Sequence, residues 1–247
     1  MEMKIDEPGQ ESRQGTGQRS AWQPSRYHLH GAGTQDFPAR IQTGTAAYRC
    51  SPAGNTVQAN EIARHLSDLA DGLHLHHSSE DDLIWPKLLA RAQPDTDLIA
   101  RMQNQHALVV RLVDQLREEL TRWRASASPE MGAPLARTCE KLSKVLDEHL
   151  GEEEAQILPL IEEHLTCPEW AEVGARGFAE VPKNRLLFFL GALCEQATSA
   201  ERADFMRMVP LPGRLAFALF GERQYRSEVA RLRSGLHDPI GIDHKLK

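Results

Sequence analysis

Several classes of protein are excluded by what this 247-residue sequence lacks. No apolar run approaches the roughly 18 residues that a membrane-spanning helix needs, and no charged-then-apolar leader opens the chain. Lysine and arginine (29 residues) are outnumbered by aspartate and glutamate (35), so the net charge of −6 gives no overall positive field for nucleic acid. We therefore expect no membrane span and no nucleic-acid partner.

Cysteine is also scarce. No two of the four cysteines form a Cys-x-x-Cys pair, and they lie far apart at Cys50, Cys139, Cys167 and Cys194. Such isolated positions favour reduced thiols over a disulfide framework or a zinc ribbon, and they indicate a cytoplasmic protein.

Histidine is abundant by contrast. The chain has 11 His, more than its 7 Phe and 3 Tyr together. Four of them crowd into one short stretch, at His65, His74, His76 and His77.

The sequence pattern divides the chain into three parts. Glycine and proline interrupt residues 1–58, where we expect a poorly ordered N-terminal region or a degenerate first helix. Residues 59–166 contain three seams, that is, rows of residues spaced by three and four that share one helix face. The first seam comprises Ile62, Leu66, Leu69, Leu73, His76, Glu80 and Leu83. The second comprises Ile99, Met102, His106, Val109, Val113, Leu116, Leu120 and Trp123. The third comprises Leu135, Cys139, Leu142, Leu146, His149, Glu153, Gln156 and Leu160.

These seams predict an all-α fold, an up-down-up-down four-helix bundle with a C-terminal helical extension over residues 167–247. Loops are expected around Pro94 and from Ser126 to Pro134. The last candidate helix, Arg214 to Arg233, is basic and could lie on an anionic membrane or bind nucleic acid, but we favour docking on the bundle because its apolar residues need burial.

Polar residues occupy core-facing seam positions where leucine would otherwise pack. A single such His is usually a hydrogen-bonded core residue, but here five polar residues share three facing seams, and buried carboxylates are costly unless they are paired or bind metal. Metal coordination is a common way to satisfy such a cluster inside a bundle. The candidate ligands are His76, Glu80, His106, His149 and Glu153.

Spacing supports this set. His-x-x-x-Glu occurs twice, and each copy continues with an acidic residue, then Ile and Pro at the same offsets, over residues 76–86 and 149–159. His77 and Asp81 have the same spacing but lie about 100° around the helix, so we interpret them as a flanking pair. His65 lies three turns before His76, and we interpret it as structural.

The candidate ligands also share one height. With turns near residues 93 and 130 and a rise of about 1.5 Å per residue, the three groups fall in one layer to within a turn. Imidazole and carboxylate donors suit iron or manganese, with zinc as an alternative, and two carboxylates can bridge two metal ions.

Three segments carry a resemblance to the hemerythrin-like (HHE cation-binding) family: HHSSEDDLIWP at 76–86, QNQH at 103–106 and HLGEEEAQILP at 149–159. The resemblance covers about residues 56–166, and the later helices resemble actinobacterial members with a C-terminal extension. It implies a four-helix bundle with a non-haem di-iron centre whose ligands are His76, Glu80, His106, His149 and Glu153.

The family also takes a His ligand from its first helix. The corresponding region here holds His28 and His30 but is followed by Gly31, Gly33 and Gly44, so we hypothesise that the first helix is degenerate.

Three functions stay open at this point. The resemblance implies a protein that binds dioxygen or senses oxygen or iron, or an oxidoreductase that consumes hydrogen peroxide or nitric oxide. The third is a helical interaction module with a vestigial metal site.

Overall fold

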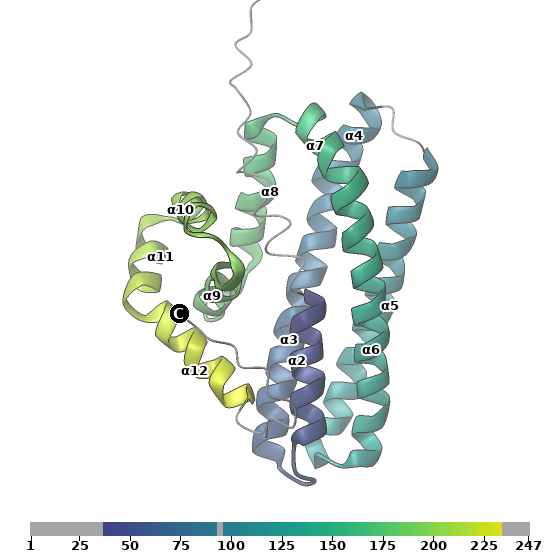
Figure 1. Ribbon diagram of the computed structural model, residues 1–247, viewed down its shortest axis with the longest axis vertical. Coiled ribbons are helices and arrows are strands. Elements are labelled where there is room, and N and C mark those ends of the chain that lie inside the picture. Colours follow the sequence, from purple (N-terminus) through teal and green to yellow (C-terminus); the bar gives the residue numbers. More distant parts are fainter. Residues whose placement is uncertain (1–36, 93–95, 234–247) are drawn as a thin grey trace, which may run out of the picture.

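The computed structural model describes residues 37–92 and 96–233, and within these ranges it contains helices and no strands. Four antiparallel helical segments form a bundle (Figure 1). They are α2 (Phe37–Cys50); α3 (Thr56–Ser79) with the π-helix η2 (Glu80–Ile84) and α4 (Trp85–Arg91); α5 (Thr96–Ser126); and α6 (Pro129–Glu152) with the π-helix η3 (Glu153–Ile157) and α7 (Leu158–His164). The predicted all-α bundle is confirmed.

We expected residues 1–58 to be poorly ordered or to contain a degenerate first helix, and the structure has a helix over residues 37–50. Helix α2 forms there and packs against α3 and α6, with Ile41 and Ala47 buried. Small residues let it approach α3 closely, since a Cβ on Gly44 would lie 2.7 Å from the Cδ2 atom of Leu66. His28 and His30 lie outside the described residues, so their part in the site stays a prediction.

The expected loop from Ser126 to Pro134 is also too long. Helix α6 already begins at Pro129, because the Ser128 side chain accepts a hydrogen bond from the Met131 N–H and a proline suits the first helical turn. The Pro94 turn lies in residues 93–95, outside the described residues.

Two apolar clusters fill the bundle, and the polar layer lies between them. The larger cluster includes Leu73, Val109 and Leu146, and the smaller includes Ile84 and Met102. Every residue of the second predicted seam is buried. The His and Glu side chains therefore interrupt a continuous core.

Both π-helices shift the seams by one residue. The sequence pattern placed Leu83 and Gln156 toward the core, but the structure buries the next residues, Ile84 and Ile157. The N–H of Trp85 bonds to the Glu80 carbonyl five residues back, and Leu158 bonds to Glu153 in the same way. In each case the next residue is a proline, which has no N–H to continue an α-helical ladder.

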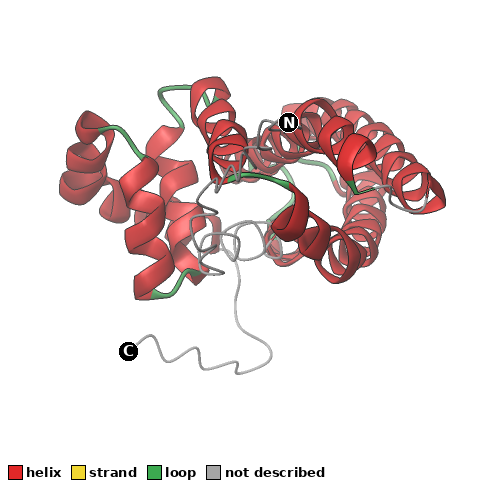
Figure 2. Ribbon diagram, turned by 90° about the horizontal axis from the view of Figure 1, so that it is seen from above, coloured by secondary structure: helices red, strands yellow, loops and turns green. Residues whose placement is uncertain are grey.

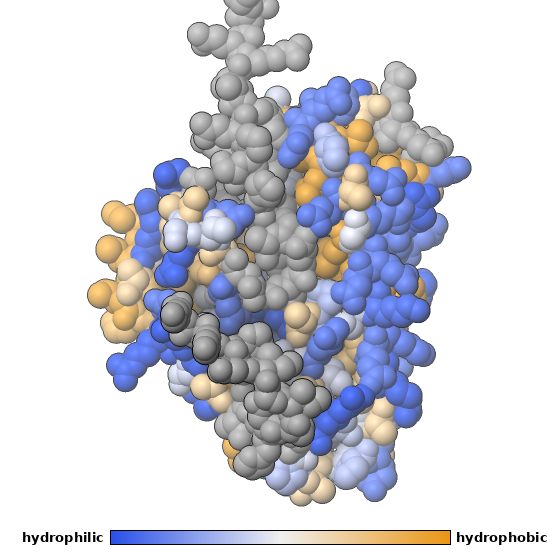
Figure 3. Space-filling view, in the orientation of Figure 1, coloured by the Kyte–Doolittle hydropathy of each residue, from blue (hydrophilic) through white to orange (hydrophobic). Residues whose placement is uncertain are grey.

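The C-terminal extension packs beside α2 and α3 (Figure 2). Its helices are α8 (Cys167–Glu180), α9 (Leu186–Gln196), α10 (Ser199–Met208), α11 (Leu211–Ala216), the π-helix η4 (Phe217–Gly221) and α12 (Glu222–Arg233). No helix within the described ranges is long and apolar enough to cross a membrane. In Figure 3 the surface over α5 and α6 is mainly hydrophilic, and apolar side chains gather at the margin formed by α10 and α11 and also at the top of the bundle near α4 and α7.

Two polar clusters attach the extension to the bundle. Arg40 of α2 donates hydrogen bonds to the Tyr225 hydroxyl at 2.6 Å and to Glu195 at 3.0 Å. Asp68 of α3 accepts from Arg185 at 3.0 Å, and the same guanidinium binds Glu228 of α12 at 3.0 Å. The expected docking of the last helix is confirmed for the face that carries Phe217, Tyr225 and Leu232, but Leu215, Leu219 and Phe220 of the same predicted helix are exposed.

Candidate metal centre

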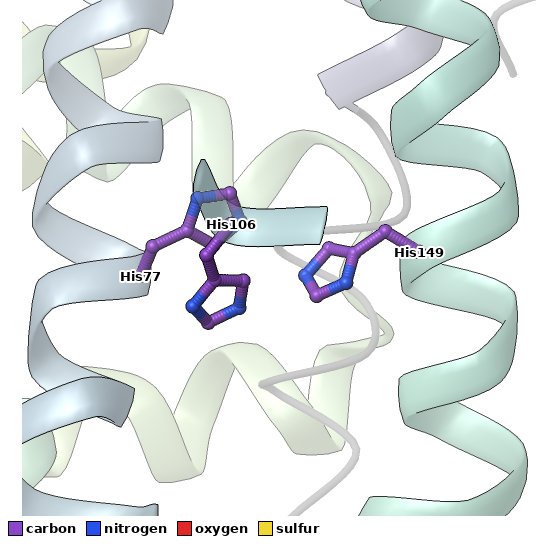
Figure 4. A group of neighbouring side chains, drawn as sticks. All are labelled: His77, His106 and His149. Atoms are coloured by element: carbon purple, nitrogen blue, oxygen red, sulfur yellow. The ribbon is translucent and has the colours of Figure 1, made fainter. Parts of the chain in front are cut away.

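Three imidazole rings meet inside the bundle, each from a different helix. His77 comes from α3, His106 from α5 and His149 from α6, and one ring nitrogen of each lies within 4.8 Å of the others (Figure 4). The His77 and His106 rings are stacked with centroids 4.2 Å apart. All three residues are buried.

A second group lies against the first and contains the repeated motif's carboxylates. His76, Glu80 and Glu153 offer ligand atoms within 4.8 Å of one another. The Glu80 Oε1 atom lies 3.4 Å from His76 Nε2, and its Oε2 atom lies 3.3 Å from His106 Nε2. The Glu153 Oε2 atom lies 3.8 Å from His76 Nε2 and 4.0 Å from His149 Nε2. Both carboxylates of the second group therefore also lie near a histidine of the first group.

All five residues that the sequence predicted as ligands come together in this cluster, and His77 joins them. The interpretation of His77 as a flanking residue is wrong, because its side chain is buried in the centre. Residues about 100° apart on one helix can both face the interior of a bundle, since the interior subtends a wide arc of each helix. The signal in the sequence was the unbroken pair His76-His77, four residues before a carboxylate pair.

Asp81 lies outside the two groups and orients His106. Its Oδ1 atom lies 3.0 Å from His106 Nδ1 and also accepts a 2.9 Å hydrogen bond from the Trp85 indole. A carboxylate can only accept, so Nδ1 of His106 carries the proton and Nε2 faces the centre. Asp81 thus acts on a histidine of another helix.

Gln105 has the equivalent relation to His149. Its Oε1 atom lies 3.0 Å from His149 Nδ1, and its amide nitrogen donates to Glu152 at 3.0 Å. Arg101 donates to the same Glu152 carboxylate at 2.6 Å. A polar chain therefore leads from the surface of α5 to the centre.

The electrostatic environment gives the three imidazoles different pKa values. Burial opposes protonation of His106, but Asp81 and Glu80 outweigh it and raise its pKa to about 9. Burial, together with the charge of His106, lowers the pKa of His149 to about 4. Burial and the neighbouring histidines also lower the pKa of His77. A metal ion binds the neutral imidazole, which is the form of His77 and His149 near pH 7, whereas His106 would have to release its Nε2 proton when a metal ion binds.

The donor atoms fit a cation. Nε2 of His77 and of His149 are both fully buried and have no hydrogen-bond partner in the described part of the chain, an arrangement that costs free energy unless a ligand engages them. Both groups contain only His and Glu, a nitrogen and oxygen donor set suited to iron, manganese or zinc. His65 is structural, as expected, with its Nε2 atom 3.3 Å from the Arg40 carbonyl oxygen.

Comparison with known families agrees with this geometry. Residues 40–161 match the family described as the hemerythrin HHE cation binding domain, a stretch that includes all six clustered residues. No curated protein and no solved structure matches the chain significantly.

Proposed function

Because residues 40–161 belong to the hemerythrin HHE cation-binding domain family, we propose that the His and Glu cluster holds a non-haem di-iron centre. The observation that carries this proposal is the position of Glu80, with one carboxylate oxygen 3.4 Å from His76 and the other 3.3 Å from His106. A carboxylate ligand shared by two metal ions would face two imidazole groups in the same way.

Six residues would hold the two ions. His77, His106 and His149 would supply imidazoles to one ion, His76 would supply an imidazole to the other, and Glu80, which lies near both groups, would serve as a carboxylate ligand. Glu153 would be the second carboxylate ligand, since its Oε2 atom lies near both His76 and His149. Manganese or zinc would accept the same donors, so the metal itself has to be measured.

The two positions differ in a way that favours binding of a small ligand. Among the described residues, the His76 side offers one imidazole where the other side offers three. The ion with fewer protein ligands would keep room for dioxygen, and iron supplies the redox chemistry that makes such binding reversible. We therefore propose a protein that binds dioxygen or senses oxygen or iron in the cytoplasm.

An oxidoreductase that consumes hydrogen peroxide or nitric oxide would use the same centre. The acidic neighbours Asp81 and Glu152 are already engaged, by His106 and Trp85 and by Gln105 and Arg101. Because both carboxylates are held in these hydrogen bonds, neither is available as a proton donor for catalytic turnover. This favours binding over catalysis. Loss of peroxide or nitric oxide at a steady catalytic rate would reverse that preference.

The test is metal analysis and a visible spectrum of the purified protein. We expect about two iron ions per chain and a charge-transfer band that changes with dioxygen. Iron-free protein that also fails to take up added Fe²⁺ would leave the interaction module with a vestigial site.

Matched substitutions locate the site. Glu153→Ala should lose most of the iron, whereas Glu154→Ala, an exposed neighbour, should keep it. His149→Ala should behave like Glu153→Ala. Full iron content in both ligand variants would show that the metal lies elsewhere.

A further inference from the structure

One surface of the C-terminal extension exposes large apolar side chains at helical spacing. Leu211, Leu215 and Leu219 follow one another every four residues, and Phe220 adjoins them; they are 60%, 56%, 70% and 64% exposed. We call these four residues the apolar ridge. Other exposed large apolar residues, such as Val57 and Met131, are scattered over the bundle. A contiguous exposed apolar patch marks an interaction site more often than an isolated side chain does.

The apolar ridge is not the face of this segment that packs in the core. The opposite side of the same segment is buried through Phe217, Gly221 and Tyr225, which also follow every four residues. A Cβ on Gly191 of α9 would press on the Tyr225 ring, so the buried side is packed closely against α9. The segment therefore has one satisfied apolar face and a second one directed outward.

Positive charge accompanies the ridge. Residues 205–227 contain four arginines and one glutamate, although the whole chain carries −6; Asp204 and Glu228 flank this stretch, and Glu228 is paired with Arg185. Arg214 and Arg223 are exposed and form no ion pair with the described residues. The single acid, Glu222, is paired with Arg202 at 3.6 Å and Arg226 at 2.9 Å.

We propose that the apolar ridge and its arginines dock on an anionic lipid surface. Interfacial segments bury an apolar face at the boundary of headgroups and acyl chains while arginines contact acidic headgroups. A second copy is disfavoured, because an isologous contact would gather Arg214 and Arg223 of both copies in one interface. The ridge also protrudes at the margin of the molecule, remote from α5 and α6, where a flat surface can reach it (Figures 1 and 3).

Docking there leaves the metal centre untouched. The ridge lies on α11 and η4, whereas the centre lies between α3, α5 and α6. The extension thus places the bundle at a membrane surface without a membrane-spanning helix, and this inference does not depend on which metal the centre holds.

The test is co-sedimentation of the full-length protein with vesicles of phosphatidylcholine alone and of phosphatidylcholine mixed with phosphatidylglycerol. We expect binding to the mixed vesicles only, weakened when the salt rises from about 0.1 to about 0.5 M. Absence of binding to the mixed vesicles, or equal binding to both kinds, would overturn the proposal.

Substitutions separate the apolar and charged contributions. Leu219→Gln with Phe220→Gln should reduce binding at least about tenfold, because each buried large apolar side chain is worth about a factor of ten or more. Arg214→Glu with Arg223→Glu should abolish the preference for anionic vesicles. Helical circular dichroism confirms that each variant is folded.

The control and the competing occupants complete the design. Val57→Gln with Met131→Gln removes exposed apolar surface from the bundle and should bind like the wild type. Light scattering that shows a dimer dissociated by Leu219→Gln would assign the ridge to a second copy. Retention by polyglutamate without retention by vesicles would assign it to an acidic protein. Either result overturns the lipid proposal.

Discussion

The Nδ1 atom of His149 lies 3.0 Å from the Oε1 atom of Gln105. An amide oxygen only accepts, so this contact keeps the proton on Nδ1 and turns the lone pair of Nε2 toward the metal centre. Glu152 holds the other end of the same amide. A residue that contacts no metal thereby decides which nitrogen of His149 is available to bind one.

We expect Gln105→Leu to lower the affinity for iron by about 10- to 100-fold, because His149 would lose the acceptor that fixes its ring. Competition with a chromogenic chelator measures this affinity. Asn104→Leu, on the exposed neighbour, is the control and should leave the affinity unchanged. Equal affinities for the two variants would mean that packing alone orients His149.

His77 provides the sharpest test of the ligand set. His77→Gln should reduce the iron content from about two ions to about one per chain, because one ion would lose one of its three imidazoles. His74→Gln, on the exposed face of the same helix, should keep both ions. Full iron content in His77→Gln would restore the interpretation of this residue as a flanking one.

The sequence was sufficient to predict the bundle and the layer, but not the detailed registry within it. Heptad spacing and the repeated motif located His106, His149 and their carboxylates, since these depend on local periodicity. The one-residue shift to Ile84 and Ile157 depends on hydrogen bonds of the π-helical type, and an assumed 3.6-residue period cannot show it. His77 was placed outside the centre for another reason: one narrow seam was taken to face the core, whereas the bundle interior spans a wide arc of α3.

For helix α2, only a degenerate first helix was expected in this region, and its bounds and its core-facing side were not predicted, for a different reason. Its core-facing positions carry Gly44, Thr45 and Ala47, which give little hydrophobic periodicity. Close approach to its neighbours, rather than large apolar side chains, buries it. Such a helix becomes visible only when the helices that surround it are known.

Two glycines of α6 should respond oppositely to alanine. A Cβ on Gly132 would overlap the Tyr48 ring of α2, which packs edge-on against Trp123 at 5.2 Å, so Gly132→Ala should destabilise the protein by about 1–3 kcal/mol. Nothing lies within 4 Å of a Cβ on Gly151, and Gly151→Ala should stabilise it by about 0.5–1 kcal/mol. Urea denaturation measures both, and a stabilising Gly132→Ala would contradict the close contact of α2 with α6.

Stability at acidic pH should report the contact between α4 and α8. Hydrogen bonds from Arg91 lower the pKa of Glu169 to about 2 from its usual 4.5, against the effect of burial. Because the folded value is the lower one, this contribution is complete above pH 4.5 and disappears as the pH falls toward 2.

Glu169→Gln should therefore cost about 1 kcal/mol at neutral pH, and the difference from wild type should shrink as the pH falls below about 4.5. Urea melts across that range measure it. Glu172→Gln, which removes a longer 3.6 Å pair with Lys87, is the control and should show little pH-dependent difference. A difference that grows on acidification would have the wrong sign.

The two polar clusters that join the extension to the bundle determine where the chain can be truncated without loss of stability. Arg40 and Asp68 belong to the bundle, but their partners Glu195 and Arg185 come from the extension. A fragment that ends at Thr166 would contain the whole family-matched stretch. It would also leave the Asp68 carboxylate and the Arg40 guanidinium without their partners from the extension. Recombinant expression, or transplantation of the centre into another host, should therefore keep the chain through α12.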